Sequence, residues 1–410
     1  MAPKSSTMQA QCCIVGGGPA GMMLGLLFAR AGIDTVVLEK HADFLRDFRG
    51  DTIHPSTLAA MDDLGLFDEL LSLPHAKARV LSGTIGDTTL RLADFSRLPT
   101  RAKYIAFMPQ WNFLDFLAGK AALYPGFRLL MRSEALSLVS DGGIVQGVIA
   151  ETPQGPLEIR AGLTIGADGR HSTVREAARF VPQEIGAPMD VLWFRLSRRP
   201  DDPHQAFGRA EAGRILILID RGEHWQCGYV IAKGTFARMQ AEDIASLRRS
   251  VAELVPFARD RVDEIASWDD VKLLTVSVNR LPVWHRPGLL CIGDAAHAMS
   301  PVGGVGINIA IQDAIATANI LAPVLRQKKT PGEAELAAVQ QRRERAVRWT
   351  QAGQVFIQNR VISAVLAHGT RPMKPPVLLR LAAQLPAFRH LTARLIGLGV
   401  QPEHVRSPVA

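Results

Sequence analysis

The stretch Cys12-Cys-Ile-Val-Gly-Gly-Gly-Pro-Ala-Gly21 decides the fold of the first part of this 410-residue chain. Its four leading residues are typical of a buried parallel strand, and the apolar run Met22–Arg30 after it is typical of a helix. Gly16, Gly18 and Gly21 fit the pattern G-x-G-x-x-G. In that pattern the first glycine allows a tight turn and the second lets a pyrophosphate approach the backbone. The third lets the helix pack closely against the strand.

A second short strand, Thr35–Leu38, ends at Glu39, 18 residues beyond Gly21. A carboxylate at this place accepts hydrogen bonds from ribose hydroxyls and disfavours a 2′-phosphate. The unit therefore predicts binding of FAD or NAD but not NADP, with a chance glycine-rich turn as the alternative. The cofactor-binding residues predicted here also include Pro19, Ala20 and Lys40.

Another glycine-rich segment follows the apolar strand Leu289–Ile292, which leads into Gly293-Asp294 and then into a loop that ends at Gly306. A long helix, Ile307–Leu325, begins there. Asp294 at a strand end can accept hydrogen bonds from a polyol such as ribitol, and glycines let backbone lie against a flat ring. The helix start places N–H donors where a reduced flavin develops negative charge. An ordinary glycine-rich loop before a capped helix is the alternative.

Together with Asp168-Gly169, these two motifs resemble the three signatures of the group A flavoprotein monooxygenases, the p-hydroxybenzoate hydroxylase family. The resemblance runs from about residue 11 to residue 325, in the family's order. It implies an FAD enzyme that uses NAD(P)H as a transient reductant and O₂ as co-substrate. The implied reaction is hydroxylation of a small phenol-, quinone- or heteroaromatic-like substrate through a flavin C4a-hydroperoxide.

The resemblance also implies roles for single residues. Asp168 helps to position the pyrophosphate and serves the nicotinamide, Gln110 contacts the FAD, and Arg49, with Arg46 as second choice, lies near the ribose and phosphates. Without the family these would be a turn, a solvated helix cap and a solvated charged loop. The residues that would line the flavin are Pro301, Gly303, Gly304 and Gly306, and Ile307 and Asn308 would meet its pyrimidine edge.

No side chain is assigned as a catalytic acid or base. His297 follows Asp294 closely, but no carboxylate in the local sequence is placed to orient it, so a structural role is expected. His54 lies near the expected flavin loop, so shaping the pocket is one role for it, but it is interpreted as a satisfied surface histidine. Thr173 and Glu176, after Asp168, predict a capping box. No metal site is predicted, because no pair of cysteines has metal-ligand spacing.

The expected fold is α/β: a discontinuous Rossmann-like FAD-binding domain over 1–180 and 281–330, with strands near 79–107 on the substrate side. A β-sheet substrate domain covers 181–280 and a helical region covers 331–410. Alternate strand residues share a face, so five substrate-domain side chains are predicted to face the pocket, although core packing explains the aliphatic ones equally well. They are Trp193, Arg195, Leu216, Leu218 and Tyr229. The family's carboxylate-gripping residues do not map cleanly here, which puts p-hydroxybenzoate itself in doubt.

The net charge of +8 and pI of about 9.6 favour anionic partners, but no nucleic-acid-binding signature accompanies them. The four cysteines lie in apolar, strand-like runs, which predicts buried thiols in a reducing cytoplasm. No run of apolar residues is expected to span a bilayer. Near the C-terminus, four arginines form one basic face beside apolar residues. This face fits a dimer interface, a membrane-surface helix or plain packing, so a monomer and a homodimer remain open. Its residues are Arg342, Arg343, Arg345 and Arg348.

Two other functions fit the same motifs. One is an FAD-dependent reductase of an isoprenoid or quinone-like substrate, and the other is a non-enzymatic flavin-binding protein. A flavin-dependent halogenase is disfavoured, because its Trp-x-Trp-x-Ile-Pro signature is absent.

Overall fold

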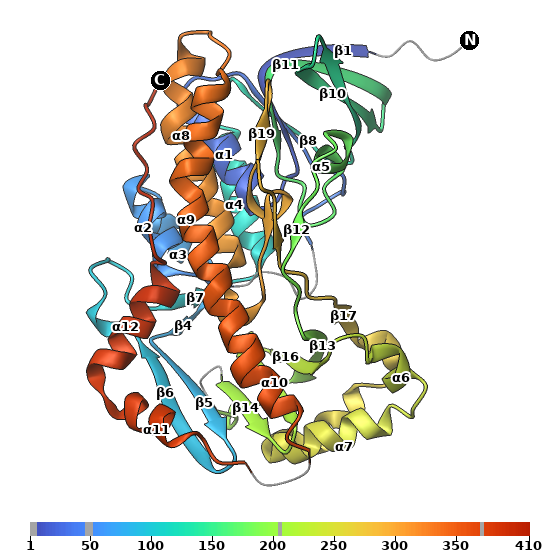
Figure 1. The fold of residues 1–410 in the computed structure, drawn as a ribbon, viewed down its shortest axis with the longest axis vertical. Coiled ribbons are helices and arrows are strands. Elements are labelled where there is room, and N and C mark those ends of the chain that lie inside the picture. The colour runs from blue at the N-terminus through green and yellow to red at the C-terminus, as the bar shows by residue number, and fades with distance from the viewer. Residues whose placement is uncertain (1–5, 46–51, 204–206, 370–372) are drawn as a thin grey trace.

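The computed structural model describes residues 6–45, 52–203, 207–369 and 373–410. Its first sheet has the strand order β19-β20-β11-β1-β2-β8 (Figure 1). The strands from β20 to β8 are parallel, β19 is antiparallel to β20, and the antiparallel hairpin β9–β10 extends β11. The predicted α/β, Rossmann-like architecture is confirmed. The strands are β1 (Ser6–Val15), β2 (Thr35–Leu38), β8 (Phe127–Leu130), β9 (Glu134–Asp141), β10 (Ile144–Thr152), β11 (Gly155–Gly166), β19 (His285–Arg286) and β20 (Leu289–Cys291).

The centre of this sheet is apolar on both faces, as a parallel sheet covered by helices must be. In β1, Cys12 to Val15 are all buried, and so is every residue from Ala20 to Ala29 of helix α1 (Pro19–Arg30). All four cysteines are free and buried. Helices that pack around this sheet and beside the loops at its edge are α2 (Pro55–Asp63), α3 (Phe67–Leu71), α4 (Gln110–Ala121), α5 (Thr173–Ala177) and α8 (Gly306–Arg326).

A second sheet of seven strands has the order β17-β13-β16-β15-β14-β5-β6 and lies below the first in Figure 1. β5 and β6 come from the first hundred residues, so the chain enters this sheet twice. The strands are β5 (Val80–Ile85), β6 (Thr88–Asp94), β13 (Met189–Ser197), β14 (Phe207–Glu211), β15 (Arg214–Asp220), β16 (His224–Ala232) and β17 (Lys272–Leu274). The domain boundaries drawn from the sequence stay a prediction.

One face of the second sheet packs against helix α7 (Ala245–Leu254) and the 3₁₀ segment η2 (Pro256–Glu264). The short helix α6 (Phe236–Gln240) precedes α7, and Pro256 begins η2. Short strands connect the two sheets: β3 (Thr52–Ile53), β4 (Ala76–Ala78) and β7 (Ile105–Phe107) form one small sheet, and β12 (Gln183–Glu184), β18 (Asn279–Arg280) and β21 (His297–Ala298) form another.

Among the described residues, one helix, Val302–Arg326, is long and apolar enough to cross a bilayer by length and composition. Length and composition alone are weak evidence of a membrane span, because the core helix of a protein passes the same test. Here 72% of the helix's most apolar window is buried inside the protein, between α1 and α9 (Glu333–Ile357). The helix is thus accounted for as a core helix.

Helix α9 runs along the outside of α8 and continues through a π-helical turn, Gln358–Ile362, into α10 (Ser363–Leu366) (Figure 1). Helices α11 (Val377–Gln384) and α12 (Pro386–Gly397) then pack against β6. The chain finally returns to the first sheet, where the Ala410 N–H donates to the Arg30 carbonyl at 2.9 Å. The last helices are therefore integral to the fold.

Candidate flavin site

The structure brings the three glycine motifs together. A Cβ on Gly16 (φ +108°) would lie 2.4 Å from the Ala167 carbonyl oxygen, so the first motif touches the second. A Cβ on Gly293 would lie 3.4 Å from the Cβ of Ala20, so the third motif touches the first. Segments almost 300 residues apart in sequence therefore form one edge at the carboxyl ends of β1, β11 and β20. Dinucleotides bind at this edge of such sheets.

Two of the glycines in the first motif are required for different reasons. A Cβ on Gly21 would lie 1.9 Å from the Gly16 carbonyl oxygen, which leaves no room for any side chain. A Cβ on Gly18, the N-cap of α1, would meet no described protein atom within 4 Å. Protein packing therefore does not explain a glycine at 18. The open space in front of the helix N-terminus fits a pyrophosphate, which the first N–H groups of α1 would bind.

Glu39 lies at the end of β2, with only 9% of its surface exposed. Its carboxylate accepts hydrogen bonds from the Gly17 N–H at 3.1 Å and the His41 N–H at 3.0 Å. A Cβ on Gly17 would come within 2.9 Å of the Glu39 Cβ, so a glycine at 17 permits this contact. The carboxylate is thus held beside the glycine turn, while Lys40 after it is exposed. The contact of Glu39 with a ribose stays a prediction.

The carboxylate of Asp168 is used by the protein itself. It accepts hydrogen bonds from the Ser172 hydroxyl at 2.5 Å and the Val174 N–H at 3.1 Å, at the start of α5. Burial raises the pKa of Asp168 above its ordinary value, although these hydrogen bonds oppose the shift. The N-cap of α5 is Ser172, which accepts from the Arg175 N–H at 2.9 Å. The capping box predicted one residue later is therefore wrong.

Arg175, which the sequence analysis did not single out, connects the second motif to the third. Its guanidinium donates to the carbonyl oxygens of Ala295 at 3.2 Å and Arg170 at 2.5 Å. The Arg170 guanidinium lies 3.8 Å from the carboxylate of Asp294, whose side chain is one-third exposed. Asp294 therefore has accessible oxygen atoms beside a positive charge. This environment fits the predicted contact with a polyol.

The loop after Asp294 has the backbone that a flat ring needs. Gly303 and Gly304 both have positive φ angles, 79° and 64°, and a Cβ on Gly304 would lie 2.7 Å from the Thr52 hydroxyl. Residues 301–307 are partly buried except for Gly303, which is exposed, whereas Met299 and Asn308 on either side are buried. Helix α8 begins at Gly306, so its first N–H groups have no partner within the helix. They supply the positive end of a helix dipole at the loop.

The side-chain amide of Asn308 is committed to the protein. Its oxygen accepts from the His54 N–H at 2.9 Å and the Thr57 hydroxyl at 2.8 Å, and its NH₂ group donates to the Thr52 carbonyl at 3.0 Å. The amide thus ties the start of α8 to the segment that begins α2. Because the side-chain amide is occupied, the predicted contact of Asn308 with the pyrimidine edge of the flavin would use its backbone N–H.

His54 is not the surface histidine that was expected, because only 1% of its surface is exposed. Its Nδ1 lies 2.8 Å from the Ile396 carbonyl oxygen, at the end of α12. Burial lowers the pKa of His54 to about 4, so the ring is neutral near pH 7. Because a carbonyl oxygen only accepts, Nδ1 carries the proton. His54 therefore links the loop before α2 to the C-terminal helices.

A buried ion-pair network lies behind the third motif. Asp313, on α8, accepts from the Gly293 N–H at 3.1 Å, from the His297 ring at 2.6 Å and from the Arg343 guanidinium at 2.9 Å. Burial would raise the pKa of Asp313, but His297 and Arg343 hold it below its ordinary value. The carboxylate that orients His297 thus belongs to Asp313, 16 residues further along the chain. In the sequence, Asp313 stands out as a single acidic residue within an apolar helix. Arg343 is fully buried, so its place in an exposed basic face is wrong.

We call residues 301–306 the flavin loop. Three glutamines of α9 and the π-helical turn hold residues 298–302, at the start of this loop and just before it. The Gln354 amide accepts from the Ser300 N–H at 3.2 Å and donates to the carbonyls of Ser300 and Val302, both at 2.9 Å. Gln358 donates to the Ser300 hydroxyl at 2.6 Å, and Gln351 donates to the Ala298 carbonyl at 3.0 Å. All three glutamine side chains are buried. Their spacing along one helix face was visible in the sequence, but their partners were not.

The five predicted substrate residues do not share a face. Trp193 pairs with Gly228, which pairs with Ile217, whereas Tyr229 pairs with Leu192 and Leu216. Directly paired residues point to the same side of a sheet. Leu216, Leu218 and Tyr229 therefore lie in the core against α7, and placing them in the pocket is wrong. Trp193 lies on the opposite face, in a cluster that includes Val302 of the flavin loop; Arg195 is exposed.

The structure gives little information on the remaining predicted cofactor-binding residues. Gln110 begins α4 and is half-buried, and its contact with a cofactor stays a prediction. Arg46 and Arg49 lie outside the described residues. Within the described part of the chain, no group of three or more His, Cys, Asp or Glu side chains could hold a metal ion.

Comparison with known proteins agrees with this geometry. A family model described as an FAD-binding domain matches residues 9–352. The 6-methylpretetramide 4-monooxygenase of Streptomyces rimosus is 32% identical over 99% of this chain and 96% of its own. Two solved structures share the fold: OxyS anhydrotetracycline hydroxylase of Streptomyces rimosus, and the myxobacterial chondrochloren halogenase CndH, an FAD-dependent halogenase.

The hydroxylase superposes with a TM-score of 0.71 at 23% identity, covering 95% of this chain and 76% of its own. The halogenase superposes with a TM-score of 0.75 at 18% identity, covering 98% of this chain and all of its own. At these identities the likeness concerns the fold alone, which different flavin chemistries share. The family match and the full-length relative decide the class. The chain belongs to the group A FAD-dependent aromatic monooxygenases, and it is an oxidoreductase that uses FAD, a reduced nicotinamide and O₂.

Proposed function

We propose that this enzyme hydroxylates a phenol-, quinone- or heteroaromatic-like ring, with NADH or NADPH as the electron source. The observation that carries the proposal is the meeting of the three motifs at one sheet edge, with open space in front of Gly18 and a partly exposed glycine loop at the other end. A site of this shape accommodates an extended dinucleotide. The full-length relationship to 6-methylpretetramide 4-monooxygenase supports ring hydroxylation as the reaction.

Bound FAD supplies the redox chemistry of the reaction. The chain's own residues would bind and orient it. The N–H groups of α1 and the carboxylate of Glu39 would hold the ADP half, and Asp294 would hold the ribitol. The first N–H groups of α8 would stabilise negative charge on the ring. A dry site is expected because the flavin loop packs against the apolar face of the second sheet that carries Trp193.

Trp193 is the substrate-binding residue best supported by packing. Its ring covers Gly228, where a Cβ would lie 2.9 Å from the ring, and it shares a cluster with Val302 of the flavin loop. A flat side chain next to the loop suits an aromatic substrate. No acid or base is proposed, because His297 is buried in the network around Asp313 and His54 is neutral and buried.

A screen with the purified yellow protein tests the function. Phenols, quinones and heteroaromatic acids, together with 6-methylpretetramide and anhydrotetracycline, would be added one at a time while NADH or NADPH oxidation is followed. We expect at least one compound to accelerate oxidation and to yield a product heavier by one oxygen atom. A product that gains two hydrogens instead would establish a reductase. The absence of any substrate-dependent oxidation would favour a flavin-binding protein without catalysis.

A further inference from the structure

The charge of this protein is concentrated in one segment. Residues 345–402 contain eight Lys and Arg residues and no Asp or Glu. Of the 47 Lys and Arg residues in the chain, 39 therefore lie elsewhere, where they are matched by all 39 Asp and Glu residues. The formal net charge of +8 thus comes entirely from this segment, which comprises the end of α9 and the helices α10, α11 and α12.

The same segment carries large apolar side chains on its surface. On α11 and at its end they recur every three or four residues, so they form one helix face, and the next helix adds two more. We define the C-terminal apolar surface as Val377, Leu378, Leu381, Leu385, Leu391 and Leu395. All six are more than half exposed, and Leu378 is 81% exposed. The buried faces of the two helices carry Ala383 and Ala393 instead. Both helices lie at the lower left of Figure 1.

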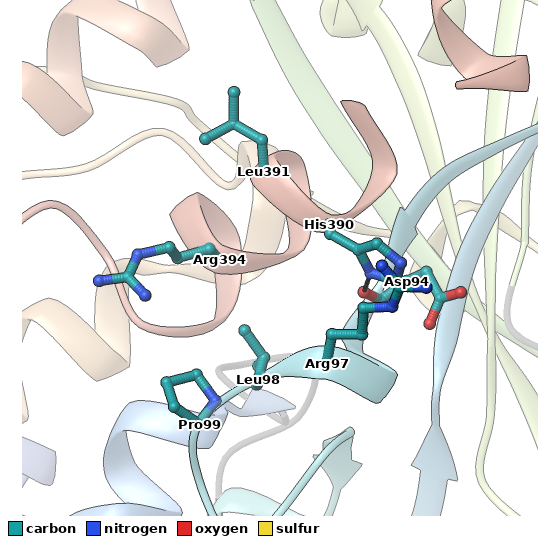
Figure 2. A pocket seen from close by; sticks show the side chains of 7 residues that line it. All are labelled: Asp94, Arg97, Leu98, Pro99, His390, Leu391 and Arg394. Atoms are coloured by element: carbon teal, nitrogen blue, oxygen red, sulfur yellow. Dashed lines mark hydrogen bonds between the residues drawn. The ribbon is translucent and has the colours of Figure 1, made fainter. Parts of the chain in front are cut away.

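Basic groups border this surface. Lys374 and Arg380 are exposed on and just before α11. Figure 2 shows a pocket of about 220 Å³ between α12 and the 3₁₀ turn Phe95–Arg97, with Arg97, His390 and Arg394 among its lining side chains and exposed Leu391 at its edge. The one acid there is Asp94, whose carboxylate accepts from the Ser96 N–H at 3.0 Å and whose carbonyl oxygen lies 3.0 Å from the His390 ring.

We propose that the C-terminal apolar surface docks this enzyme on an anionic lipid bilayer. Exposed leucines would enter the boundary between headgroups and acyl chains, and the surrounding basic side chains would contact lipid phosphates. A second copy of the chain is the poorer partner, because a two-fold contact through this surface would bring basic residues face to face. Nucleic acid would satisfy the charge but would leave the leucines exposed to water.

Flotation with lipid vesicles tests the proposal on the FAD-loaded full-length protein. Vesicles of phosphatidylcholine with about 30% phosphatidylglycerol would be compared with phosphatidylcholine alone. We expect binding to the anionic vesicles only, weakened strongly when salt is raised from roughly 0.05 M to 0.5 M, because screening removes the attraction between charges. Equal binding to both vesicles, or no binding to either, would overturn the proposal.

Variants separate the apolar contribution from the charge. Arg380→Gln should lower the partition coefficient about fivefold, the effect of one basic residue near an anionic surface. Leu378→Glu combined with Leu381→Glu should abolish flotation. Leu123→Glu is the matched control, because Leu123 is 74% exposed on the turn after α4, outside the C-terminal segment, and this variant should float like the wild type.

Bound FAD and thermal unfolding should be unchanged in all variants, since the replaced side chains are exposed. If the double variant floats as well as the wild type, the surface is not the docking site and the proposal fails. It also fails if the wild type forms a dimer that does not float and the double variant sediments as a monomer, because a second copy then covers the leucines.

Discussion

The two ends of the candidate flavin site are held by different means. At the β1–α1 turn, backbone lies directly against backbone: Gly21 against the Gly16 carbonyl and Gly16 against the Ala167 carbonyl. At the flavin loop, 301–306, side chains from distant elements hold the backbone. Gln354 donates to the Val302 carbonyl from 52 residues away, and Thr52 donates to the Gly304 carbonyl across 252 residues.

This difference predicts different responses to mutation. A turn in which backbone touches backbone has no room to adjust, so a single added methyl group displaces the chain. A loop held by side-chain hydrogen bonds can lose one of them and remain folded in a shifted position. Adding a side chain to a packed glycine at the first end should therefore disrupt the turn completely, whereas losing one hydrogen bond at the second end should disturb the loop only in part.

The largest effect is expected for Gly21→Ala. Its Cβ would lie 1.9 Å from the Gly16 carbonyl oxygen, so strand and helix must separate. We expect the free energy of unfolding to fall by about 3 kcal/mol or more and FAD to be lost. Urea unfolding and the flavin absorbance of the purified protein measure both. A variant with native stability would show that the turn is more adaptable than its contacts indicate.

His54 tests the loop end through pH. Its pKa in the folded state is about 4, below its ordinary 6.5, so folding favours the neutral ring. The resulting stability is fully present above pH 6.5 and is lost as pH falls towards 4, by about 3 kcal/mol. His54→Asn keeps an N–H donor for the Ile396 carbonyl but cannot titrate. Unfolding free energies between pH 4 and 7 should fall less steeply in the variant, and an unchanged slope would refute the assignment.

Gln354→Leu tests the loop end through position, with Gln340→Leu as its matched control. Gln340 lies on the same helix and makes the same kind of backbone contacts, accepting from the Trp284 N–H at 2.9 Å and donating to the Pro282 carbonyl at 2.8 Å. Each substitution should cost about 2 kcal/mol of stability, because buried backbone groups lose their partners.

Of these two variants, Gln354→Leu alone should also alter the flavin, since Gln354 contacts the flavin loop and Gln340 contacts Trp284 and Pro282 instead. We expect a shifted visible spectrum of the bound flavin and a larger share of NAD(P)H oxidation that yields hydrogen peroxide instead of product. Equal spectra and equal coupling in the two variants would mean that the loop is not positioned by α9.

The smallest effect is expected for Gly18→Ala. A Cβ at 18 meets no described protein atom, and the backbone angles there, φ −74° and ψ −175°, suit any residue. Stability without cofactor should therefore stay within about 0.5 kcal/mol of the wild type. FAD affinity should fall about tenfold, or about 1.4 kcal/mol, because the methyl group enters the space assigned to the pyrophosphate. Titration of the apoprotein with FAD measures this, and unchanged affinity would move the pyrophosphate elsewhere.

The same distinction between local and long-range contacts explains which features of the structure could be predicted from the sequence. Strand β2 and helix α8 were predicted to within one residue at each end, and the last residues of β1 and α1 were predicted correctly, because turn glycines and apolar periodicity are local signals. The starts of β1 and α1 lie earlier in the chain than predicted, at Ser6 and Pro19. The pocket-facing residues of the second sheet were not, since the register of β13, β15 and β16 decides which side each residue faces. The burial of His54 was missed as well, because α12 covers it from 342 residues away.

By itself, the sequence determined where backbone must turn sharply, which strands and helices surround those turns, that a dinucleotide fits them, and that all the net charge lies in residues 345–402. Only the tertiary structure decided that Gln354 and Asn308 hold the flavin loop, that Arg343 is buried against Asp313, and that the leucines of α11 are exposed. The reason is range. Turn glycines and apolar periodicity can be recognised from residues a few positions apart, whereas a buried hydrogen bond or an exposed leucine depends on how distant helices pack.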